Sequence, residues 1–587
     1  NKSSSDNDEE DNDGEERVLS EREQIFAKLA CLPINTDGET LCPKMRGVIK
    51  EIAEKLAERY NREPCIDNMF NLLVFPKLVI APAKEKNRIS ETKRRGRLLM
   101  ESKMAELLEL QKHALEPRQR DAPTTRDQQM SAKEVEQVNR HMANGQLRKA
   151  MAIVRGLAGV APMNQDTVEA LLAKQMQGVD NPFGDAVGVL PPRLKDTEAL
   201  DKIVNDLDPQ AAAGVSGWTP GLLNLCYGNA QNESTAKFRK FMMGLSQHIW
   251  MGTAPGGSLL CCAQLTALLK DAAHGGGIRP VTCGELFYRV GMRLILKEHG
   301  TQDCLDDNQF GVGSKGGVEP LLEKLNQELD GMHEGRQKRY LYILDLVNAF
   351  NRVSRTAVSD EIDASAPHFR RVFKWAYNNP SILVVGKNVR ELVILLSEGG
   401  MRQGCTIASF GFSLGIKATL RSLKLLVANG FGDAVLGYLD DVHIYSDDGN
   451  LMPRIIDFFK KPADGSERED GLELNVDKTK MFDLSVAKTD NDGIKTLGAC
   501  KGSYAARLHF LEEKIATVRQ TVARLANLPR QQALKLLRLC VGNELRHLLR
   551  TMDVSDLKEQ LGEMDQTLFD EIDRLRMAPA DAPRTAK

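Results

Sequence analysis

The chain has 587 residues, of which 42% are hydrophobic and 27% charged, and its formal net charge is -2. This length exceeds what one hydrophobic core supports, so several subdomains are expected. No stretch approaches the ~18 consecutive apolar residues of a membrane span, which argues against a membrane-spanning protein. The 11 cysteines include no C-x-x-C pair, which argues against a zinc finger and a disulfide framework.

The first residues carry a large share of the acidity. Residues 1–16 hold eight acidic side chains against Lys2 alone, so we predict a disordered acidic tail over residues 1–20. The remainder of the chain is therefore mildly basic. No secretory signal opens the chain, and its start at Asn1 indicates a fragment or a processed product from a reducing compartment.

A helical N-terminal region is predicted over residues 21–113. The basic run Lys93–Arg97 within it is either a solvated helix face, a phosphate-binding patch or a nuclear import signal. Residues 114–135 combine many charges with two prolines, which predicts a linker. Residues 136–195 are predicted to be a helical extension. Helical spacing is clearest in one apolar stripe, which consists of Met45, Val48, Ile49, Ile52 and Leu56.

A hairpin with a basic end is predicted before the centre of the chain. Leu265–Lys270 and Gly275–Val281 have the composition of two strands around a glycine-rich turn. Lys270 and Arg279 would project from this hairpin. A guanidinium is planar and always charged, which suits a bidentate grip on phosphate, and a lysine adds a point charge.

Two later stretches place carboxylates at strand ends. Arg339–Leu344 is an apolar strand that ends at Asp345, and Gly437–Tyr445 predicts a hairpin with Asp440 and Asp441 at its tip. Because no basic residue adjoins the hairpin tip, a divalent cation is the expected partner, and carboxylate oxygens suit Mg²⁺ or Mn²⁺. For the hairpin alone, the alternative is a type I turn whose aspartates cap their own backbone.

These segments, in their order along the chain, resemble the sequence motifs of reverse transcriptases. The resemblance to the palm motifs rests on Asp345-x-x-x-x-Phe350, Gln403-Gly404-Cys405, Tyr438-Leu439-Asp440-Asp441, the stretch from Gly471 to Thr479, and Leu497-Gly498. Gly277-Ile278-Arg279-Pro280-Val281 resembles the fingers motif. Ser216-Gly217-Trp218-Thr219-Pro220 resembles the non-LTR retrotransposon branch, particularly elements of protists. The ordered motifs extend over about half the chain.

The resemblance implies an α+β right-hand polymerase that follows the helical N-terminal region. Its fingers would occupy residues 196–335, its palm residues 336–500, and its thumb and C-terminal tail residues 501–587. The implied activity is RNA-directed DNA synthesis, in which dNTPs extend a primer 3′-hydroxyl on an RNA template. For a retrotransposon protein, the primer would be nicked chromosomal DNA and the location the nucleus, otherwise the cytoplasm.

The resemblance also implies roles for single residues. Asp345, Asp440 and Asp441 would hold two Mg²⁺ ions, with Mn²⁺ as a possible substitute. Lys478 would protonate or neutralise the leaving pyrophosphate, unless it is a plain surface lysine. Arg279 and Lys270 would bind the incoming triphosphate.

Two further residues would line the nucleotide site. Phe350 would exclude a ribose 2′-hydroxyl, unless it is ordinary core. Gln403 would lie beside the nucleotide and template. Most relatives carry Pro-Leu-Ser-Pro after this glutamine motif, whereas this chain has Thr406-Ile407-Ala408-Ser409, so its exact template contact is left open.

The proposed thumb has an apolar and a basic face. The apolar side chains fall on one helical stripe, which consists of Leu534, Leu537, Val541, Leu545 and Leu548. The basic side chains lie on another, which consists of Lys535, Arg538, Arg546 and Arg550. Residues 501–550 hold ten Lys or Arg against three Glu, which predicts binding to a nucleic-acid duplex. A solvated helix face is the alternative.

Other classes fit the sequence less well. A telomerase-like or intron-encoded enzyme of the same palm is the nearest alternative, and no telomeric RNA-binding region is recognisable. A domesticated, inactive nucleic-acid-binding protein would not need the three carboxylates. No histidine-cysteine metal cluster indicates a nuclease, so we expect any DNA nicking to come from a missing segment or a partner.

Overall fold

The computed structural model describes residues 17–576, apart from 36–40, 83–84, 113–129, 144, 157–158, 210, 230–232, 271–275, 315, 332–338, 387, 428–433, 463–467, 488 and 490–492. Most of the predicted acidic tail (1–16) and of the predicted linker (114–129) lies outside the described residues. Among the described helices, none is long and apolar enough to cross a membrane.

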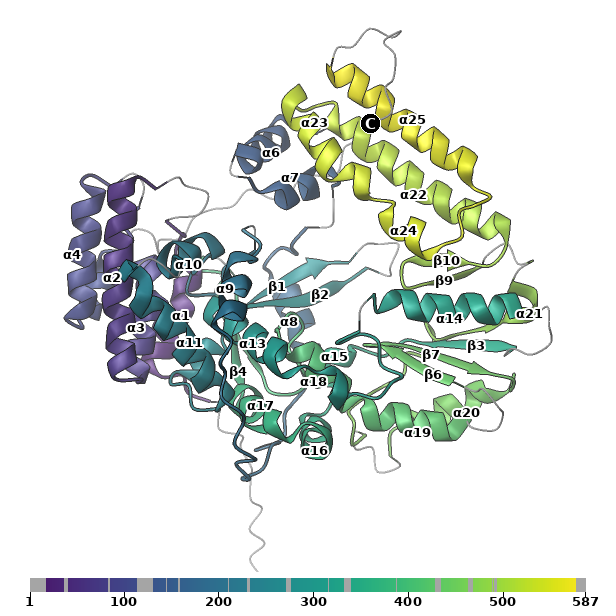
Figure 1. Cartoon of the computed structure of the whole chain (residues 1–587), viewed down its shortest axis with the longest axis horizontal. Coiled ribbons are helices and arrows are strands. Elements are labelled where there is room, and N and C mark those ends of the chain that lie inside the picture. The colour runs from purple at the N-terminus through teal and green to yellow at the C-terminus, as the bar shows by residue number, and fades with distance from the viewer. Residues whose placement is uncertain are drawn as a thin grey trace, which may run out of the picture.

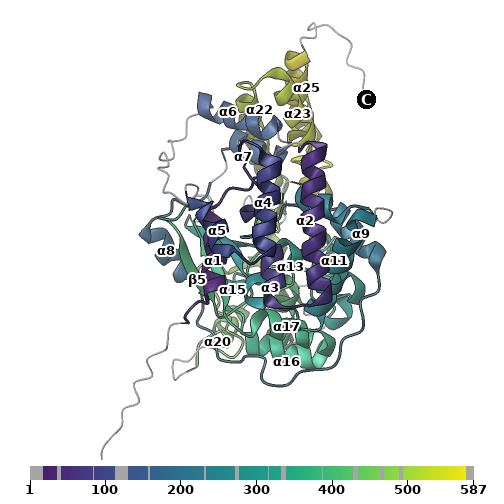
Figure 2. The same cartoon turned by 90° about the vertical axis from the view of Figure 1, so that its left-hand side faces the viewer.

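The N-terminal region is helical, as predicted, and packs on the fingers. Its helices are α1 (Glu21–Lys28), α2 (Pro43–Arg62), α3 (Ile66–Leu78), α4 (Arg88–Met100) and α5 (Met104–Glu109). The predicted apolar stripe of α2 is buried in the large core that it shares with the fingers. Gly96 brings α4 against α2, because a Cβ there would lie 2.7 Å from Ile52 Cδ1. Figure 2 shows these two helices side by side.

The basic run of α4 is in part a structural feature. Arg94 and Arg95 both bond to Glu91, at 2.9 and 2.8 Å, and Arg95 is buried. These two arginines hold the pKa of Glu91 at about 2. At least two arginines of the basic run therefore form ion pairs within the fold.

The predicted helical extension divides between two cores. α6 (Ala132–Ala143) and α7 (Leu147–Val154) share a core with the thumb, whereas α8 (Gln165–Leu172) packs on a sheet of the fingers. The backbone joins α8 to this sheet just before the helix, where the Ala161 N–H donates to the Ala267 carbonyl at 2.8 Å. Figures 1 and 2 both place α6 and α7 beside the thumb helices.

The fingers surround a buried tryptophan and a mixed sheet. Trp218 is fully buried, and its Nε1 donates to the Leu72 carbonyl at 2.8 Å. The sheet has the order β2-β1-β4-β5, with β1 antiparallel to β2 and parallel to β4. The elements of the fingers are α9 (Thr197–Asn205), α10 (Pro220–Tyr227), α11 (Ala236–Trp250), α12 (Gly257–Leu260), β1 (Ala263–Leu269), β2 (Ile278–Gly284), α13 (Leu286–His299) and α14 (Val318–Gly331).

A second sheet, β6-β7-β3-β8, is antiparallel throughout and forms the centre of the palm. Alternate side chains of β3 face opposite cores: Leu341 packs with α14, and Tyr342 packs in the core that includes α19. Figure 1 shows α14 on one face of this sheet and α19 and α20 on the other. The strands are β3 (Tyr340–Leu344), β6 (Ala434–Tyr438), β7 (Asp441–Ser446) and β8 (Lys480–Asp483).

The remaining elements of the predicted palm include β4 and β5, which complete the first sheet, and β9 and β10, which form a separate two-stranded sheet. They are α15 (Ala349–Arg352), α16 (Arg355–Ser365), α17 (Arg370–Tyr377), β4 (Ser381–Val385), β5 (Val393–Ser397), α18 (Ala408–Gly415), α19 (Lys417–Val427), α20 (Leu451–Phe458), α21 (Leu484–Ala487), β9 (Ile494–Thr496) and β10 (Ala499–Lys501). Two of these helices, α18 and α19, follow one another with only Ile416 between them.

The thumb is helical and has its own core. It consists of α22 (Tyr504–Leu525), α23 (Arg530–Leu539), α24 (Arg546–Thr551) and α25 (Lys558–Arg576). The prediction of one continuous stripe from Leu534 to Leu548 is wrong, because α23 ends at Leu539 and a 3₁₀ turn, Val541–Asn543, precedes α24. The predicted α+β class with a helical N-terminal region is confirmed, and the division into fingers, palm and thumb stays a prediction.

Candidate active site

Asp440 and Asp441 lie at the tip of the β6–β7 hairpin, where Tyr438 pairs with Asp441. Leu439 in this turn has a φ of 56°, a left-handed conformation that costs a branched residue about 1–3 kcal/mol. The hairpin is held by the preceding loop, since the Phe310 N–H donates to the Gly437 carbonyl at 2.8 Å. The strained turn is therefore fixed by its surroundings and presents both carboxylates.

Asp345 follows β3 directly, beside the hairpin. Leu344 pairs with Val442, so Asp345 and Asp441 come next on adjacent antiparallel strands. The Asp345 N–H donates to Thr479 Oγ1 at 3.2 Å, and its carbonyl accepts from the Asn475 N–H at 2.8 Å. The loop that carries Lys478 is thus hydrogen-bonded to the backbone of Asp345.

The three carboxylates repel one another. Partial desolvation, followed by the charges of Asp440 and Asp345, raises the pKa of Asp441 to about 6. Desolvation and the charge of Asp345 also raise the pKa of Asp440, while Arg279 acts in the opposite direction. Asp440 and Asp441 are nevertheless exposed at the surface, so solvent and a bound cation can reach them.

The chemistry of these donors fits a hard divalent cation. Carboxylate oxygens that raise each other's pKa gain from a shared positive charge. In the part of the chain that the structure describes, no group of three or more His, Cys, Asp or Glu residues is close enough to enclose a metal ion. Mg²⁺ commonly uses one or two carboxylates and completes its shell with water and substrate phosphates, and the chemistry of Asp345 and Asp440 fits such an ion.

Cationic side chains approach the carboxylates from the fingers. Arg279 on β2 pairs with Leu268 on β1, is exposed, and its charge acts on Asp440. The Lys270 N–H donates to the Gly277 carbonyl at 2.8 Å, which closes the hairpin. Lys270 and Lys478 both lie within electrostatic reach of a third lysine, Lys174. Sequence reasoning missed Lys174, because no motif marks the stretch around it.

Phe350 and Gln403 are joined to the same region through the backbone. The Phe350 ring is half-buried and stacks on Phe412, with 4.6 Å between centroids and 13° between planes. The Phe350 carbonyl accepts from the Met401 N–H at 2.6 Å, and the Gln403 carbonyl accepts from the Thr282 N–H at 2.8 Å. Phe350 therefore uses one face for packing and retains partial exposure.

Gly404 has a structural requirement of its own. Its φ is 100°, and a Cβ there would lie 2.3 Å from the Thr282 carbonyl oxygen. Only glycine allows this approach without displacement of the backbone. The close neighbour of Gly404 is therefore β2, the strand that carries Arg279.

A cluster of buried polar side chains adjoins Gln403. Arg402 donates to Ser381 Oγ and lies over the Tyr377 ring, 4.2 Å from its centroid. The Tyr288 hydroxyl lies 3.0 Å from Cys405 Sγ. Burial acts to raise the pKa of the Cys405 thiol, but Arg402 and the tyrosine hydrogen bonds hold it below its usual range. Nothing in the sequence pattern indicated this cluster.

The predicted thumb residues lie apart from the carboxylates, on two helices. Lys535 and Arg538 are exposed on α23, and Arg546 and Arg550 are exposed on α24. Arg550 forms an ion pair with Glu319 of α14. The structure therefore supplies an exposed basic surface on α23 and α24, with Arg550 already engaged with α14.

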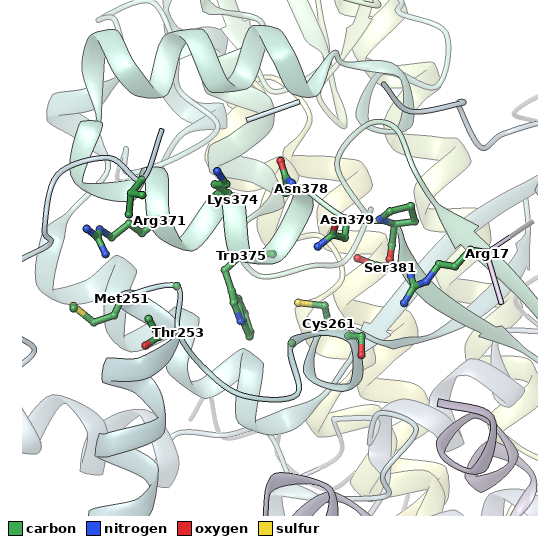
Figure 3. A pocket seen from close by; sticks show the side chains of 16 residues that line it. Arg17, Met251, Thr253, Cys261, Arg371, Lys374, Trp375, Asn378, Asn379 and Ser381 are labelled. Carbon is green, nitrogen blue, oxygen red and sulfur yellow. Dashed lines mark hydrogen bonds between the residues drawn. The ribbon is translucent and has the colours of Figure 1, made fainter. Parts of the chain in front are cut away.

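A cavity of about 680 Å³ contains none of the predicted site residues. Figure 3 shows Arg371, Lys374 and Trp375 on its wall. Arg371 Nε donates to the Val189 carbonyl at 3.1 Å, and Trp375 Nε1 donates to the Ala254 carbonyl at 3.0 Å. These polar groups serve the fold, so the cavity does not replace the carboxylates as the candidate site.

Comparison with known proteins agrees with the geometry. Residues 270–500 match the family described as reverse transcriptase (RNA-dependent DNA polymerase). The chain is also 26% identical, over 294 residues, to the retrotransposable element SLACS 132 kDa protein of Trypanosoma brucei gambiense. That alignment covers 49% of this chain and 23% of the relative, so the chain spans less than a quarter of the relative's length.

Solved structures give weaker matches. Apo telomerase from Candida tropicalis aligns with a TM-score of 0.32 and 9% identity, over 54% of this chain and 62% of that chain. Telomerase from Candida albicans with a fragment of telomeric RNA aligns with a TM-score of 0.28 and 11% identity, over 55% and 62%. Both scores are too low to support an inference. The family match covers Asp345, Asp440, Asp441 and Lys478, so residues 270–500 are similar to the reverse transcriptase family that the sequence motifs resemble.

Proposed function

We propose that this chain is the reverse transcriptase of a non-LTR retrotransposon, which copies an RNA template from a primer 3′-hydroxyl on nicked chromosomal DNA in the nucleus. The observation that carries the proposal is the convergence of Asp345, Asp440 and Arg279 at the end of the palm sheet. The retrotransposon relative supports the biological class.

The proposed cofactor is Mg²⁺, held by Asp345 and Asp440. When bound, the metal supplies positive charge that stabilises the attacking 3′-oxygen and the leaving pyrophosphate. Asp441, next to Asp440 on the same turn, adds negative charge that favours cation binding. The family as a whole indicates divalent metal ions, and the acidic oxygen donors here favour magnesium over a softer metal.

The chain's own side chains account for the remaining steps. Arg279 binds the triphosphate through a bidentate guanidinium, and Lys270 adds a point charge from the same hairpin. Lys478, on the loop bonded to Asp345, donates a proton to the pyrophosphate or neutralises it. Phe350 limits the space beside the sugar. Gln403 lies beside the nucleotide, and its backbone carbonyl accepts a hydrogen bond from the Thr282 hydroxyl.

The proposal is tested by primer extension with the purified full chain on an RNA template in Mg²⁺. Asp345→Asn and Asp440→Asn should abolish nucleotide addition, because each removes a metal ligand and with it stabilisation of the transition state. Primer–template affinity and thermal unfolding should stay close to the parent values, since phosphate contacts elsewhere dominate binding.

The control is Asp447→Asn, on an exposed carboxylate after β7 that is not among the proposed ligands. It should extend the primer like the parent. If the parent binds an RNA–DNA duplex but never extends it, the chain is a nucleic-acid-binding protein and the enzymatic proposal is lost. Extension at the parent rate by both ligand variants would remove the metal assignment alone.

A further inference from the structure

Lys174 lies directly against the turn that follows Asp345. Its Nζ is 3.3 Å from Asn348 Oδ1, and its carbonyl accepts a hydrogen bond from Asn351 Nδ2 at 3.2 Å. Asn348 has a φ of 47° at the start of α15. Both ends of the residue, side chain and backbone, are therefore held by the same palm turn.

The backbone beyond Lys174 is fixed as well. The Gly399 N–H donates to the Met176 carbonyl at 3.1 Å, and a Cβ at Gly399 would lie 2.8 Å from the Met176 Cβ. On the other side, α8 packs on β2 of the fingers. Lys174 thus lies on a short segment that contacts the fingers hairpin through α8 and the palm through Met176.

Lys174 lies within electrostatic reach of two lysines from distant parts of the sequence, Lys270 and Lys478. Desolvation, together with the charges of Lys270 and Lys478, lowers the pKa of Lys174. Among the described residues, no ion pair with a carboxylate is formed by any of the three lysines. Like charges that converge without counter-charges cost free energy, and a polyanion bound among them would offset that cost.

We propose that Lys174 is an additional contact for the triphosphate of the incoming nucleotide, supplied by the segment that precedes the fingers. The inference rests on the proposed polymerase function, and it deepens that function by one residue. Lys270 contacts the triphosphate from the hairpin tip, and Lys478 contacts it from the loop bonded to Asp345. Lys174 contacts it from a third side. Asn348 and Asn351 orient the lysine without neutralising it.

The first test compares Lys174→Gln, which removes the charge, with Lys174→Arg, which keeps it. Lys202→Gln, on an exposed lysine of α9, is the matched control. Affinity for the next correct dNTP is measured on a complex with a dideoxy-terminated primer, so that no catalysis is needed. Lys174→Gln should weaken dNTP affinity about tenfold, Lys174→Arg should restore most of it, and Lys202→Gln should have no effect.

Primer–template affinity separates the alternatives, and it should not change in any of these variants. A loss of primer–template affinity with normal dNTP affinity would show that Lys174 contacts nucleic acid, and would overturn the proposal. Unchanged dNTP affinity in Lys174→Gln would overturn it as well.

A second measurement uses the unaltered chain and so does not depend on whether a variant folds. Acetylation of lysines by a soluble active ester, followed by mass spectrometry, should show Lys174 protected when the correct dNTP joins the dideoxy-terminated complex, and unprotected with a mismatched dNTP. Equal labelling in both would refute the contact. Failure of the parent to extend any primer would refute the polymerase function separately, because labelling and binding do not require turnover.

Discussion

At the scale of single residues, we predict that Phe350 decides which sugar the proposed polymerase accepts. If its exposed edge lies under the sugar, a 2′-hydroxyl is excluded by a clash, and the exclusion should vanish when the ring is removed. Phe350→Val should raise ribonucleotide incorporation relative to deoxynucleotide incorporation by at least an order of magnitude, roughly 1.4 kcal/mol. The measurement is the ratio of kcat/KM for matched nucleotides in single-nucleotide extension.

Phe350→Tyr, which keeps the ring, is the control and should retain discrimination. Because Phe350 also stacks on Phe412, the valine variant should lose some stability, which thermal unfolding would detect. A variant that still adds deoxynucleotides with an unchanged ratio would place Phe350 in the core alone. A parent that prefers ribonucleotides would contradict DNA synthesis itself.

The same scale shows where sequence reasoning succeeds. Asp345, Asp440 and Asp441 could be found because strand ends and a tight turn leave a period-two pattern with an acidic residue at a fixed place. Lys174 and the Arg402–Cys405 cluster could not, since their roles depend on residues more than a hundred positions away. Such groups carry no local pattern, and only the fold brings them together.

At the scale of elements, α23 offers the clearest test of nucleic-acid binding. Lys535 and Arg538 are exposed on it. Reversing both to Glu should weaken duplex binding without regard to sequence. The slope of log affinity against log salt concentration should become shallower by about two, because about two fewer counterions are released on binding. The measurement is primer–template affinity across a salt series.

A matched charge reversal, Lys558→Glu at the start of α25, is exposed but outside the proposed basic surface, and it should leave the slope nearly unchanged. Equal slopes for the parent and the double variant would show that α23 is only solvated.

The helix boundaries explain one error of the sequence interpretation. Leu534 to Leu548 keep a helical spacing, yet Cys540 has φ -116° and ψ -62° at the end of α23 and the chain turns before α24. Asn543 and Gly542 favour such a turn, but they are too few to overrule the apolar period in a single sequence. The four basic residues are exposed, but they lie on two helices, α23 and α24, and not on the single helical stripe that the sequence predicted.

At the scale of the whole molecule, segments far apart in sequence complete each other's cores. α6 and α7 bury Val138, Met151 and Val154 against the thumb, and Arg155 of this segment pairs with Glu544 at 2.7 Å. The domain order read from the sequence treated residues 136–195 as one unit. Sequence periodicity identified the helices, but it contains no information on which distant core receives their apolar faces.

This arrangement predicts that a change in α6 will be felt in the thumb. Val138 is fully buried, so Val138→Asp places an unpaired charge in the shared core and should destabilise it by several kcal/mol. Hydrogen exchange should then accelerate in α22 and α23, and primer–template affinity should fall, because the basic surface of the thumb is no longer held in place. The dNTP affinity of any complex that still forms should change little, since the strands that carry Arg279 and Asp345 pack in cores other than that of the thumb. Glu136→Ala, on the exposed side of the same helix, is the control and should leave exchange in the thumb unaltered. Accelerated exchange confined to α6 and α7, with α22 and α23 still protected, would show that the thumb core is stable without them.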